Sequence, residues 1–461
     1  MFTEEKKNSQ ISQDSDNVYK PADEIETSNF IKEVYKRNLP TEIVGTNTKN
    51  FIGNKLQCAK VLDLSRLSGI VEYLPEELYI KVKACTPISL IEESLEKNNQ
   101  QLAFEPIDFG YLKNSKSNKG TAAGQLSCNF SGSRRFKVGS LRDHILGFRG
   151  VNGKGDIIKS GGTVVKNVTG YDLSKLVTGS FGTLTALTEI TFKVLPKKDS
   201  ISTLAIYSED NKVITDLFNQ LASTSNEISG AVYIPNEPNN KNYTKNMKKI
   251  FKFNDLKYEG SFVAVRIEGS KKSIDERIQN ISQELKINKM KTSILDFYQS
   301  KLFWEKINNL ELFSGTKNNL LRAVIPPATS LDLMKYLKNN FKYYIDWCGS
   351  LFWIEVLENE NTQIKEIKNE EQWTKYVDKF LAIVAEETEK NSGNFKFIGG
   401  GQPHTYVQKN HDLMFAALVE FNSLQDAVDA VDDPRYQDAL AELGENSEDV
   451  VIRNLAIVEG T

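Results

Sequence analysis

The sequence reads Gly161-Gly-Thr-Val-Val-Lys-Asn-Val-Thr-Gly-Tyr-Asp172 and, after a short apolar segment, Gly179-Ser-Phe-Gly-Thr-Leu184. Both runs belong to a glycine-rich region between Thr121 and Leu195, whose other segments favour strands. A glycine beside a strand often marks a place where the backbone approaches another group too closely for a Cβ atom. The repetition of this pattern indicates a bulky cofactor bound along the backbone.

Short-range patterns predict the structure on either side of these glycines. Ile145 to Val151 and Ile157 to Ser160 are expected to form a β-hairpin, because the intervening Asn152-Gly-Lys-Gly-Asp156 begins with the strongest short-range hairpin signal. Asp172 is placed to cap a short helix over residues 173–177, which Gly179 ends. A half-buried strand is expected next, with these apolar residues on one face at a period of two: Leu184, Ala186, Ile190, Phe192 and Val194.

Three features of this region are suited to binding a charged cofactor. Thr121-Ala-Ala-Gly124 is a small-residue turn whose bare N–H groups are expected to face an anion such as a pyrophosphate. Asn129-Phe-Ser-Gly132-Ser-Arg134-Arg135 adds positive charge and bidentate donors. The alternative for these arginines is a solvated or salt-bridged surface. Gly182-Thr183, after the capped helix, is expected to approach an adenine or a ribose.

Several motifs occur in the order found in one known family. Gly139-Ser-Leu-Arg-Asp143, with the two runs quoted first, resembles the FAD-binding subunits of glycolate oxidase, which belong to the vanillyl-alcohol-oxidase/PCMH flavoprotein superfamily. The similarity includes Leu62-Asp-Leu-Ser-Arg-Leu67, Phe104-Glu-Pro106 and Ile345-Asp-Trp347, and it covers roughly residues 30–355. It implies an α+β fold: a two-part PCMH-type FAD-binding domain followed by an α+β cap domain, with a divergent β-α-β C-terminal tail.

The chain is expected to divide into four segments. Residues 1–28 lack apolar periodicity and are expected to be a disordered N-terminal tail. The PCMH-type FAD-binding domain is expected over residues 29–199, and the cap domain over residues 200–405. The FAD-binding domain is expected to consist of a βαβ-like half before Phe104 and a β-rich half after Thr121. The fourth segment is a small α+β tail over residues 411–461.

The composition of the tail differs from that of the rest of the chain. No lysine follows Lys409, and Ala, Asp and Glu dominate. Residues 415–421 and 450–458 are expected strands, and residues 423–443 an expected helix. This pattern loosely resembles the DUF1330/EthD-like domains. It predicts either an appended module for self-association or a replacement of the family's usual end.

Periodicity and turn residues predict further elements. In the FAD-binding domain they are a helix over 28–37, a short strand running into a turn over 41–49, one or two strands over 71–85, a helix over 87–97 and a polar loop over 109–119. In the cap they are strands at 201–207 and 262–267 and helices at 213–222, 274–285 and 330–339. Arg266 and Glu268 are expected to be a cross-strand pair at the surface.

The resemblance implies that the loop after the strand at Thr41 cradles the FAD pyrophosphate with main-chain N–H groups. Thr46 and Asn47 stand here where glycines are usual; asparagine tolerates a left-handed backbone, whereas a threonine with positive φ would be strained. FAD is expected to be bound non-covalently, since no histidine lies in this loop. The residues predicted to bind it are Gly45, Thr46, Asn47, Thr48, Lys49, Pro106, Thr121, Ala123, Gly124, Asn129, Ser131, Gly132, Arg134, Arg142, Asp143, Gly182 and Thr183.

Composition restricts the function classes. A net charge of −3 gives no reason to expect a nucleic-acid partner. The four cysteines are widely spaced, so neither an iron–sulfur cluster nor a zinc site is predicted. No segment is apolar enough to suggest a signal peptide or a membrane span. Of three histidines, His144 is expected to be structural, while His404 and His411 lie in the divergent end, so the catalytic residues stay unassigned.

The sequence therefore predicts an FAD-binding subunit of a glycolate oxidase or dehydrogenase complex that oxidises glycolate to glyoxylate. Resemblance implies a second flavoprotein subunit and an iron–sulfur subunit as partners, with a cytoplasmic location or membrane association through those partners. Two alternatives stay open: a cofactor-poor structural subunit of the same complex, and a stand-alone FAD-dependent dehydrogenase of another 2-hydroxy acid.

Overall fold

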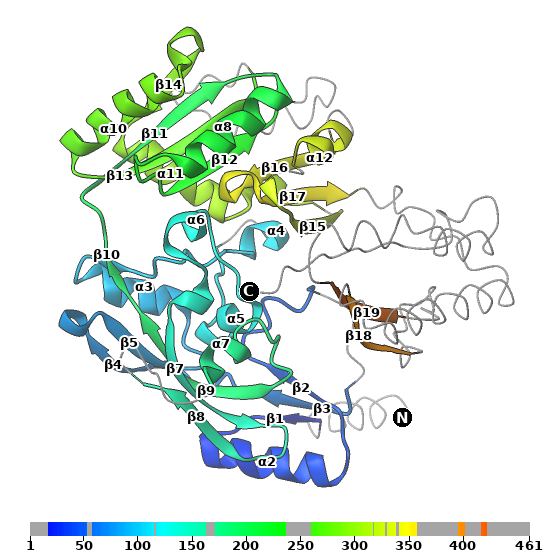
Figure 1. Ribbon diagram of the computed structural model, residues 1–461. Helices are drawn as coiled ribbons and strands as arrows, with labels where there is room; N and C mark the ends of the chain where they lie inside the picture. Colours follow the sequence, from blue (N-terminus) through cyan, green and yellow to red (C-terminus); the bar gives the residue numbers. More distant parts are fainter. Residues whose placement is uncertain are drawn as a thin grey trace, which may run out of the picture. The chain divides into compact units, whose positions relative to one another are not determined.

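The computed structural model describes residues 17–52, 58–114, 117–162, 171–236, 260–316, 318–327, 330–337 and 341–356, together with 395–401 and 416–421. The chain divides into two compact units (Figure 1). The first ends at Val356, and the second consists of residues 357–461 with residues 53–55. The FAD-binding region and the described part of the cap thus lie in one unit.

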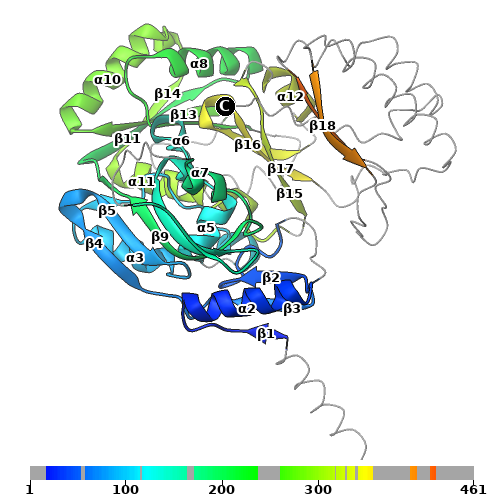
Figure 2. The same cartoon turned by 60° about the horizontal axis from the view of Figure 1, so that its bottom comes forward.

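The N-terminal part of the chain is a small parallel sheet with a helix beside it. The sheet has the order β1 (Val18–Tyr19), β3 (Lys60–Asp63), β2 (Thr41–Val44). Helix α2 (Glu24–Lys36) lies beside this sheet (Figure 2), and its Ile31 belongs to the same apolar core as Leu62 of β3. The disordered tail predicted for residues 1–28 is therefore wrong from Val18 onward, because Asp23 caps α2 by accepting a hydrogen bond from Glu26 N–H.

The second sheet of the FAD-binding region is five-stranded and antiparallel. Its order is β4 (Ile70–Leu74), β5 (Tyr79–Lys83), β9 (Thr185–Lys193), β7 (Ile145–Asn152), β8 (Ile157–Gly161). The hairpin predicted around Asn152 is confirmed by the pairing of β7 with β8. The two predicted halves are not separate, since β4 and β5 come from the first half but join this sheet. Strand β9 is the central strand of this sheet, and it is buried on both faces rather than one.

Short helices surround these sheets. The face predicted for residues 87–97 is confirmed in α3, where Ile88, Ile91 and Leu95 are fully buried. Asp172 caps α7 as predicted, its side chain accepting from Lys175 N–H. The loop predicted over 109–119 contains a short helix. The remaining elements are α3 (Ile88–Glu96), β6 (Gln100–Gln101), α4 (Gly110–Asn114), α5 (Ala122–Cys128), α6 (Arg135–Val138), α7 (Leu173–Val177) and β10 (Leu195–Pro196), which pairs with β6.

The cap is a seven-stranded antiparallel sheet with helices, as the α+β prediction requires. Its order is β14 (Thr292–Leu295), β11 (Ser200–Tyr207), β13 (Phe262–Gly269), β12 (Gly230–Ile234), β16 (Lys342–Asp346), β17 (Leu351–Val356), β15 (Asn319–Val324). The predicted strands at 201–207 and 262–267 are β11 and β13. The three predicted helices are α8 (Asn211–Ser223), α10 (Lys271–Glu284) and α12 (Ser330–Leu337), and a fourth is α11 (Phe297–Asn308).

Each face of the cap sheet has its own apolar core. One core contains residues of α8, α10 and α12, including Phe218, Ile274 and Met334. The other contains Trp304 of α11 and residues of the FAD-binding region, including Phe109 and Phe130. The cap sheet therefore packs through this second face against the FAD-binding region.

The second unit is described only by the antiparallel pair β18 (Phe395–Gly401) and β19 (Ala416–Phe421). Strand β19 matches the strand predicted at 415–421. The predicted helix over 423–443, the predicted strand over 450–458 and the predicted boundary at residue 405 lie outside the described residues. Among the described residues, no helix has both the length and the apolar composition that crossing a membrane requires.

Candidate functional site

The loop after β2 meets the start of α5, although the two are far apart in sequence. A Cβ atom on Gly45 would lie 3.0 Å from Cys85 Sγ and 3.5 Å from Thr121 Oγ1. A Cβ atom on Gly120 would lie only 2.5 Å from Thr48 Oγ1, and Gly120 has a φ of +72°. Side chains at these two positions would separate the loop from the helix, so the glycines permit their close approach.

The backbone of this loop follows the expectation for its two departures from the family pattern. Asn47 takes the left-handed conformation with a φ of +53°. Thr46 does not adopt a positive φ. The left-handed position in this loop is thus occupied by an asparagine, which tolerates that conformation. Thr46 is not strained in this way.

The N–H groups at the start of α5 are not bare, contrary to the prediction for Thr121 to Gly124. Ala122 N–H donates to Thr86 O at 3.0 Å, and Ala123 N–H donates to Ala84 O at 2.8 Å. Gly124 N–H donates to the capping Thr121 Oγ1 at 3.2 Å. Two neighbouring carbonyls and the Thr121 hydroxyl accept from the N–H groups that the sequence assigned to an anion.

A positive charge instead lies where the loop meets the helix. The Lys49 ammonium donates to Thr48 Oγ1 and to Lys119 O, both at the long distance of 3.4 Å. No carboxylate in the described part of the chain forms an ion pair with it. Burial lowers the pKa of Lys49, an effect that the more distant Cys128 and Asp108 oppose. A half-buried ammonium with weak partners is suited to a phosphate group.

Aromatic side chains lead from Lys49 to the cap. Its Nζ lies 6.0 Å from the ring centroid of Phe109. That ring packs edge-on against Phe130, with the centroids 5.0 Å apart. The guanidinium carbon of Arg322, on the edge strand β15 of the cap, lies 5.5 Å from the Phe130 centroid. These contacts form a continuous path between two half-buried cations.

Arg322 is a functional candidate that the sequence prediction missed, whereas Arg135 was predicted only as one of the paired arginines after Gly132. The guanidinium carbons of Arg322 and Arg135 lie 4.9 and 4.1 Å from the centroid of the same indole ring, that of Trp347. Burial, together with the charge of Arg135, lowers the pKa of Arg322 to about 10. Arg135 lies beside the predicted Arg134, but no local signal identifies Arg322, because only the fold brings β15 to this place.

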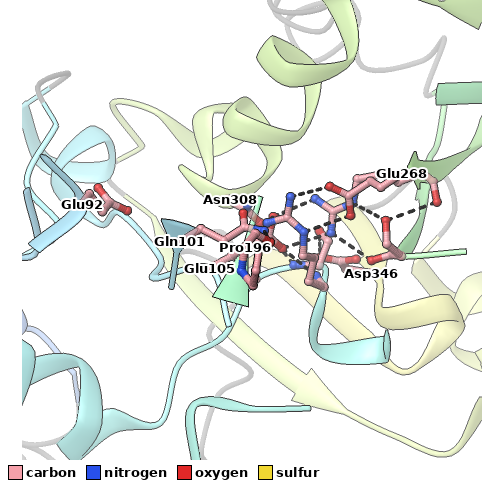
Figure 3. A network of polar contacts seen from close by, with 12 residues as sticks. Glu92, Gln101, Glu105, Pro196, Glu268, Asn308 and Asp346 are labelled. Carbon is pink, nitrogen blue, oxygen red and sulfur yellow. Dashed lines mark hydrogen bonds and ion pairs between the residues drawn. The ribbon is translucent and has the colours of Figure 1, made fainter. Parts of the chain in front are cut away.

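Four buried charges join the FAD-binding region to the cap (Figure 3). Glu105 accepts hydrogen bonds from the guanidinium of Arg134 at 3.0 Å and from that of Arg266 at 2.7 and 3.1 Å. Arg134 also donates to Glu268 at 2.6 and 3.0 Å. Neighbouring arginines lower the pKa of Glu105 and bring that of Glu268 to about 2. Arg134 is thus committed to carboxylates that hold the cap.

The prediction that Arg266 and Glu268 form a surface cross-strand pair is wrong. Both belong to β13, two residues apart, and therefore project from the same face of the sheet. The Arg266 side chain is only 1% exposed. The Arg266 side chain is buried because it contacts Glu105 of the FAD-binding region. The alternation of inward and outward side chains along the strand could not reveal this contact.

Gly132 lies against the cap at the same interface. A Cβ atom on it would lie 2.4 Å from Asn308 Oδ1 and 2.7 Å from the Cβ atom of Glu105. Its carbonyl accepts from Trp347 Nε1 at 3.0 Å. Next to it, Ser133 Oγ donates to Asp346 at 2.7 Å, and burial raises the pKa of Asp346 to about 6. Cap docking explains this glycine without a cofactor.

The remaining predicted residues lie in turns and caps around α5. Asn129 ends α5 in a left-handed conformation, and its side chain accepts from the N–H of the exposed Arg142. Asp143 accepts from Ser140 N–H and Oγ. The hydroxyl of buried Ser131 accepts a hydrogen bond from Leu141 N–H, and that of Thr183 donates one to Ser180 O. Gly182 has a φ of +77°, and Pro106 is buried.

His144 has the structural character predicted for it. It is 3% exposed, its Nε2 lies 3.0 Å from Val138 O, and burial lowers its pKa. Its Nδ1 is buried without a hydrogen-bond partner. His404 and His411 lie outside the described residues.

Comparisons with known proteins agree with this arrangement. The family described as "FAD binding domain" matches residues 15–161, and a family described as "Domain of unknown function (DUF1330)" matches residues 362–461. The Escherichia coli protein named glycolate oxidase subunit GlcE is 29% identical over 72% of this chain and 80% of its own length. The chain therefore contains an FAD-binding domain and is similar to a glycolate oxidase subunit over most of that subunit's length.

Two further matches are more limited in length or in identity. The Bacillus subtilis protein named glycolate oxidase subunit GlcD is 37% identical over 25% of this chain, which is 23% of its own length. The structure of p-cresol methylhydroxylase covers 74% of both chains with a TM-score of 0.56 at 14% identity, so it supports the fold alone.

The described residues fit FAD at one end of the site. Lys49 would offer its phosphates a positive charge that forms no ion pair among the described residues, beside a loop in which Asn47 is left-handed. Arg134 and Gly132 do not contribute in the same way, since carboxylates and Asn308 occupy them. Among the predicted cofactor residues in the loop and at the cap interface, those that stay available to FAD lie in the loop after β2, next to the start of α5.

Proposed function

We propose that this chain is the FAD-binding subunit of a complex that oxidises glycolate to glyoxylate. The observation that carries the proposal is the half-buried ammonium of Lys49, held by two long hydrogen bonds where the loop of residues 45–49 meets α5. Residue 49 lies within the segment matched by the FAD-binding domain family. The similarity to a glycolate oxidase subunit over most of that relative supports the choice of substrate.

Each end of the site has a task in this proposal. Lys49 neutralises the phosphates of FAD, and the loop of residues 45–49 orients them. Bound FAD supplies the acceptor for the hydride that leaves the hydroxyl-bearing carbon. Phe109 and Phe130 exclude water along the path toward the cap. The other predicted cofactor residues outside the cap interface, including Gly182 and Thr183, remain proposed contacts.

The partners proposed are a second flavoprotein subunit and an iron–sulfur subunit. Relatives named as different subunits of glycolate oxidase match the chain, which favours work within an assembly. The described residues hold no group of three metal-ligating side chains, so electrons leaving the flavin would pass to a cluster in another subunit. A cytoplasmic location, with membrane association only through partners, follows from this division of tasks.

The test is the flavin content of the purified chain, released by denaturation and quantified per polypeptide, followed by glycolate-dependent dye reduction with and without the partner subunits. Lys49→Met should reduce bound FAD at least about tenfold, since a charge-assisted phosphate contact is lost. Lys97→Met removes an exposed lysine paired with Glu93 and should leave flavin content unchanged. Absence of FAD from the wild-type chain, even when FAD is added, would refute the proposal.

One observation favours a second candidate, a cofactor-poor structural subunit of the same complex. The N–H groups of residues 122–124 all donate within the protein, so the start of α5 offers fewer donors than the family resemblance implies. A chain that binds no flavin but still raises the activity of its partner subunits would support this candidate.

A further inference from the structure

We propose that Arg322 and Arg135, together with the Trp347 ring, form a binding site for the carboxylate of a small organic acid. This inference rests on the proposed function and deepens it, because it assigns the substrate's carboxylate to named residues of this chain. It concerns binding only and requires no chemical step.

The charge of Arg322 is uncompensated within the described part of the chain. None of the ion pairs there includes its guanidinium, and its Nε is buried with no hydrogen-bond partner. Arg135 is half-buried and also lacks an ion pair; Asp143 only partly opposes the lowering of its pKa by burial. Two like charges beside one ring repel each other, and Arg135 lowers the pKa of Arg322 accordingly.

The same interface provides an internal comparison. Arg134 and Arg266 are buried as well, but Glu105 contacts both of them and Glu268 lies against both. A buried cation is costly unless an anion or a hydrogen-bonding partner compensates it. The positive charges of Arg134 and Arg266 are thus neutralised by carboxylates of the protein, whereas Arg322 pairs with none among the described residues. A bound external anion would neutralise Arg322.

The surroundings of Arg322 suit a planar anion. Its guanidinium carbon lies within 6 Å of the ring centroids of Phe130, Trp347 and Trp353. The Trp347 ring is fixed because Nε1 donates to Gly132 O. A guanidinium stacked on aromatic rings keeps its N–H edge available for a bidentate contact with a carboxylate. Surrounding rings also limit the water that would weaken this contact.

The site lies at the end of the aromatic path opposite to Lys49. Arg322 and Leu320 share a face of β15, the face that packs with Phe109 and Phe130 of the FAD-binding region. A small acid held here would lie between the cap sheet and that region, separated from Lys49 by the two rings. The two cations therefore have separate tasks: phosphate at one end and carboxylate at the other.

Oxalate is the probe, because it carries the planar carboxylate of glycolate but no oxidisable carbon–hydrogen bond. Its dissociation constant is measured by calorimetry on the purified full chain and on Arg322→Met, Arg322→Lys and Arg135→Met. We expect binding to weaken at least about tenfold in both Met variants and less in Arg322→Lys. Arg37→Met, in an exposed pair with Glu33, is the matched control and should bind oxalate normally.

Thermal unfolding gives a second readout. Without oxalate, Arg322→Met should melt no lower than the wild type, since it removes an uncompensated cation; added oxalate should raise the melting temperature of the wild type only. Unchanged oxalate binding in Arg322→Met would overturn the inference. So would loss of FAD from that variant, which would assign Arg322 to the cofactor. A flavin-free chain with Arg322-dependent oxalate binding would contradict the proposed function and support this site.

Discussion

Glu105→Gln should destabilise the first compact unit strongly, because Glu105 is the central acceptor between the FAD-binding region and the cap. It accepts from Arg134 N–H at 2.6 Å and from the guanidiniums of both Arg134 and Arg266. Removing its charge leaves two buried arginines with Glu268 as their remaining carboxylate. Removing one partner of such a buried group costs about 3–5 kcal/mol.

That cost should be visible in a thermal melt. In a chain of this size about 3–5 kcal/mol corresponds to a fall in melting temperature of roughly 3–5 °C. The control is Glu33→Gln, whose carboxylate pairs with Arg37 on the exposed face of α2 and should contribute less than about 1 kcal/mol. A double variant, Glu105→Gln with Arg134→Met, should recover part of the loss, because it restores the balance of charge.

The pH dependence separates charge from packing. The pKa values of Glu105 and Glu268 are lowered in the folded protein, that of Glu268 to about 2. The network therefore stabilises the fold above the usual carboxyl pKa of about 4.3, and this contribution is lost as the pH falls through the folded values. The difference between wild type and Glu105→Gln should shrink below about pH 4. A difference independent of pH, or one no larger than that of Glu33→Gln, would refute the reasoning.

Three further substitutions test the interface and the loop. Gly132→Ala should cost about 1–3 kcal/mol, since its Cβ would lie 2.4 Å from Asn308 Oδ1, and Asn308→Ala should relieve part of this cost in a denaturant melt. The melting temperature of Asp346→Asn relative to that of the wild type should be higher at pH 8 than at pH 4. The reason is that the folded pKa of Asp346 is about 6, so the buried carboxyl becomes charged, and destabilising, as the pH rises through this value. The same difference in melting temperature at both pH values would contradict this. Asn47→Val should lower flavin content whereas Asn47→Gly should keep it, because the φ of +53° suits glycine and not a β-branched residue; equal flavin retention would exclude the loop's role.

Local patterns alone determined much of the fold. The apolar spacing of residues 88–95 fixed the buried face of α3, Asn152-Gly153 fixed the hairpin, and Asp172 fixed the start of α7. The cap helices α8, α10 and α12 follow from the same kind of spacing. These features depend on neighbours within a few residues, so the sequence contains both partners of each interaction. The glycine-rich motifs likewise indicated the cofactor class.

Only the tertiary structure decided which charges are compensated. Arg134 was predicted to bind the cofactor and Arg266 to lie at the surface, yet both are buried against Glu105. Arg322 carried no sequence signal, although it forms no ion pair with a carboxylate among the described residues and its Nε is buried without a hydrogen-bond partner. The free energy of a charge depends on its burial and on partners distant in the sequence, and both are set when the cap sheet packs on the FAD-binding region.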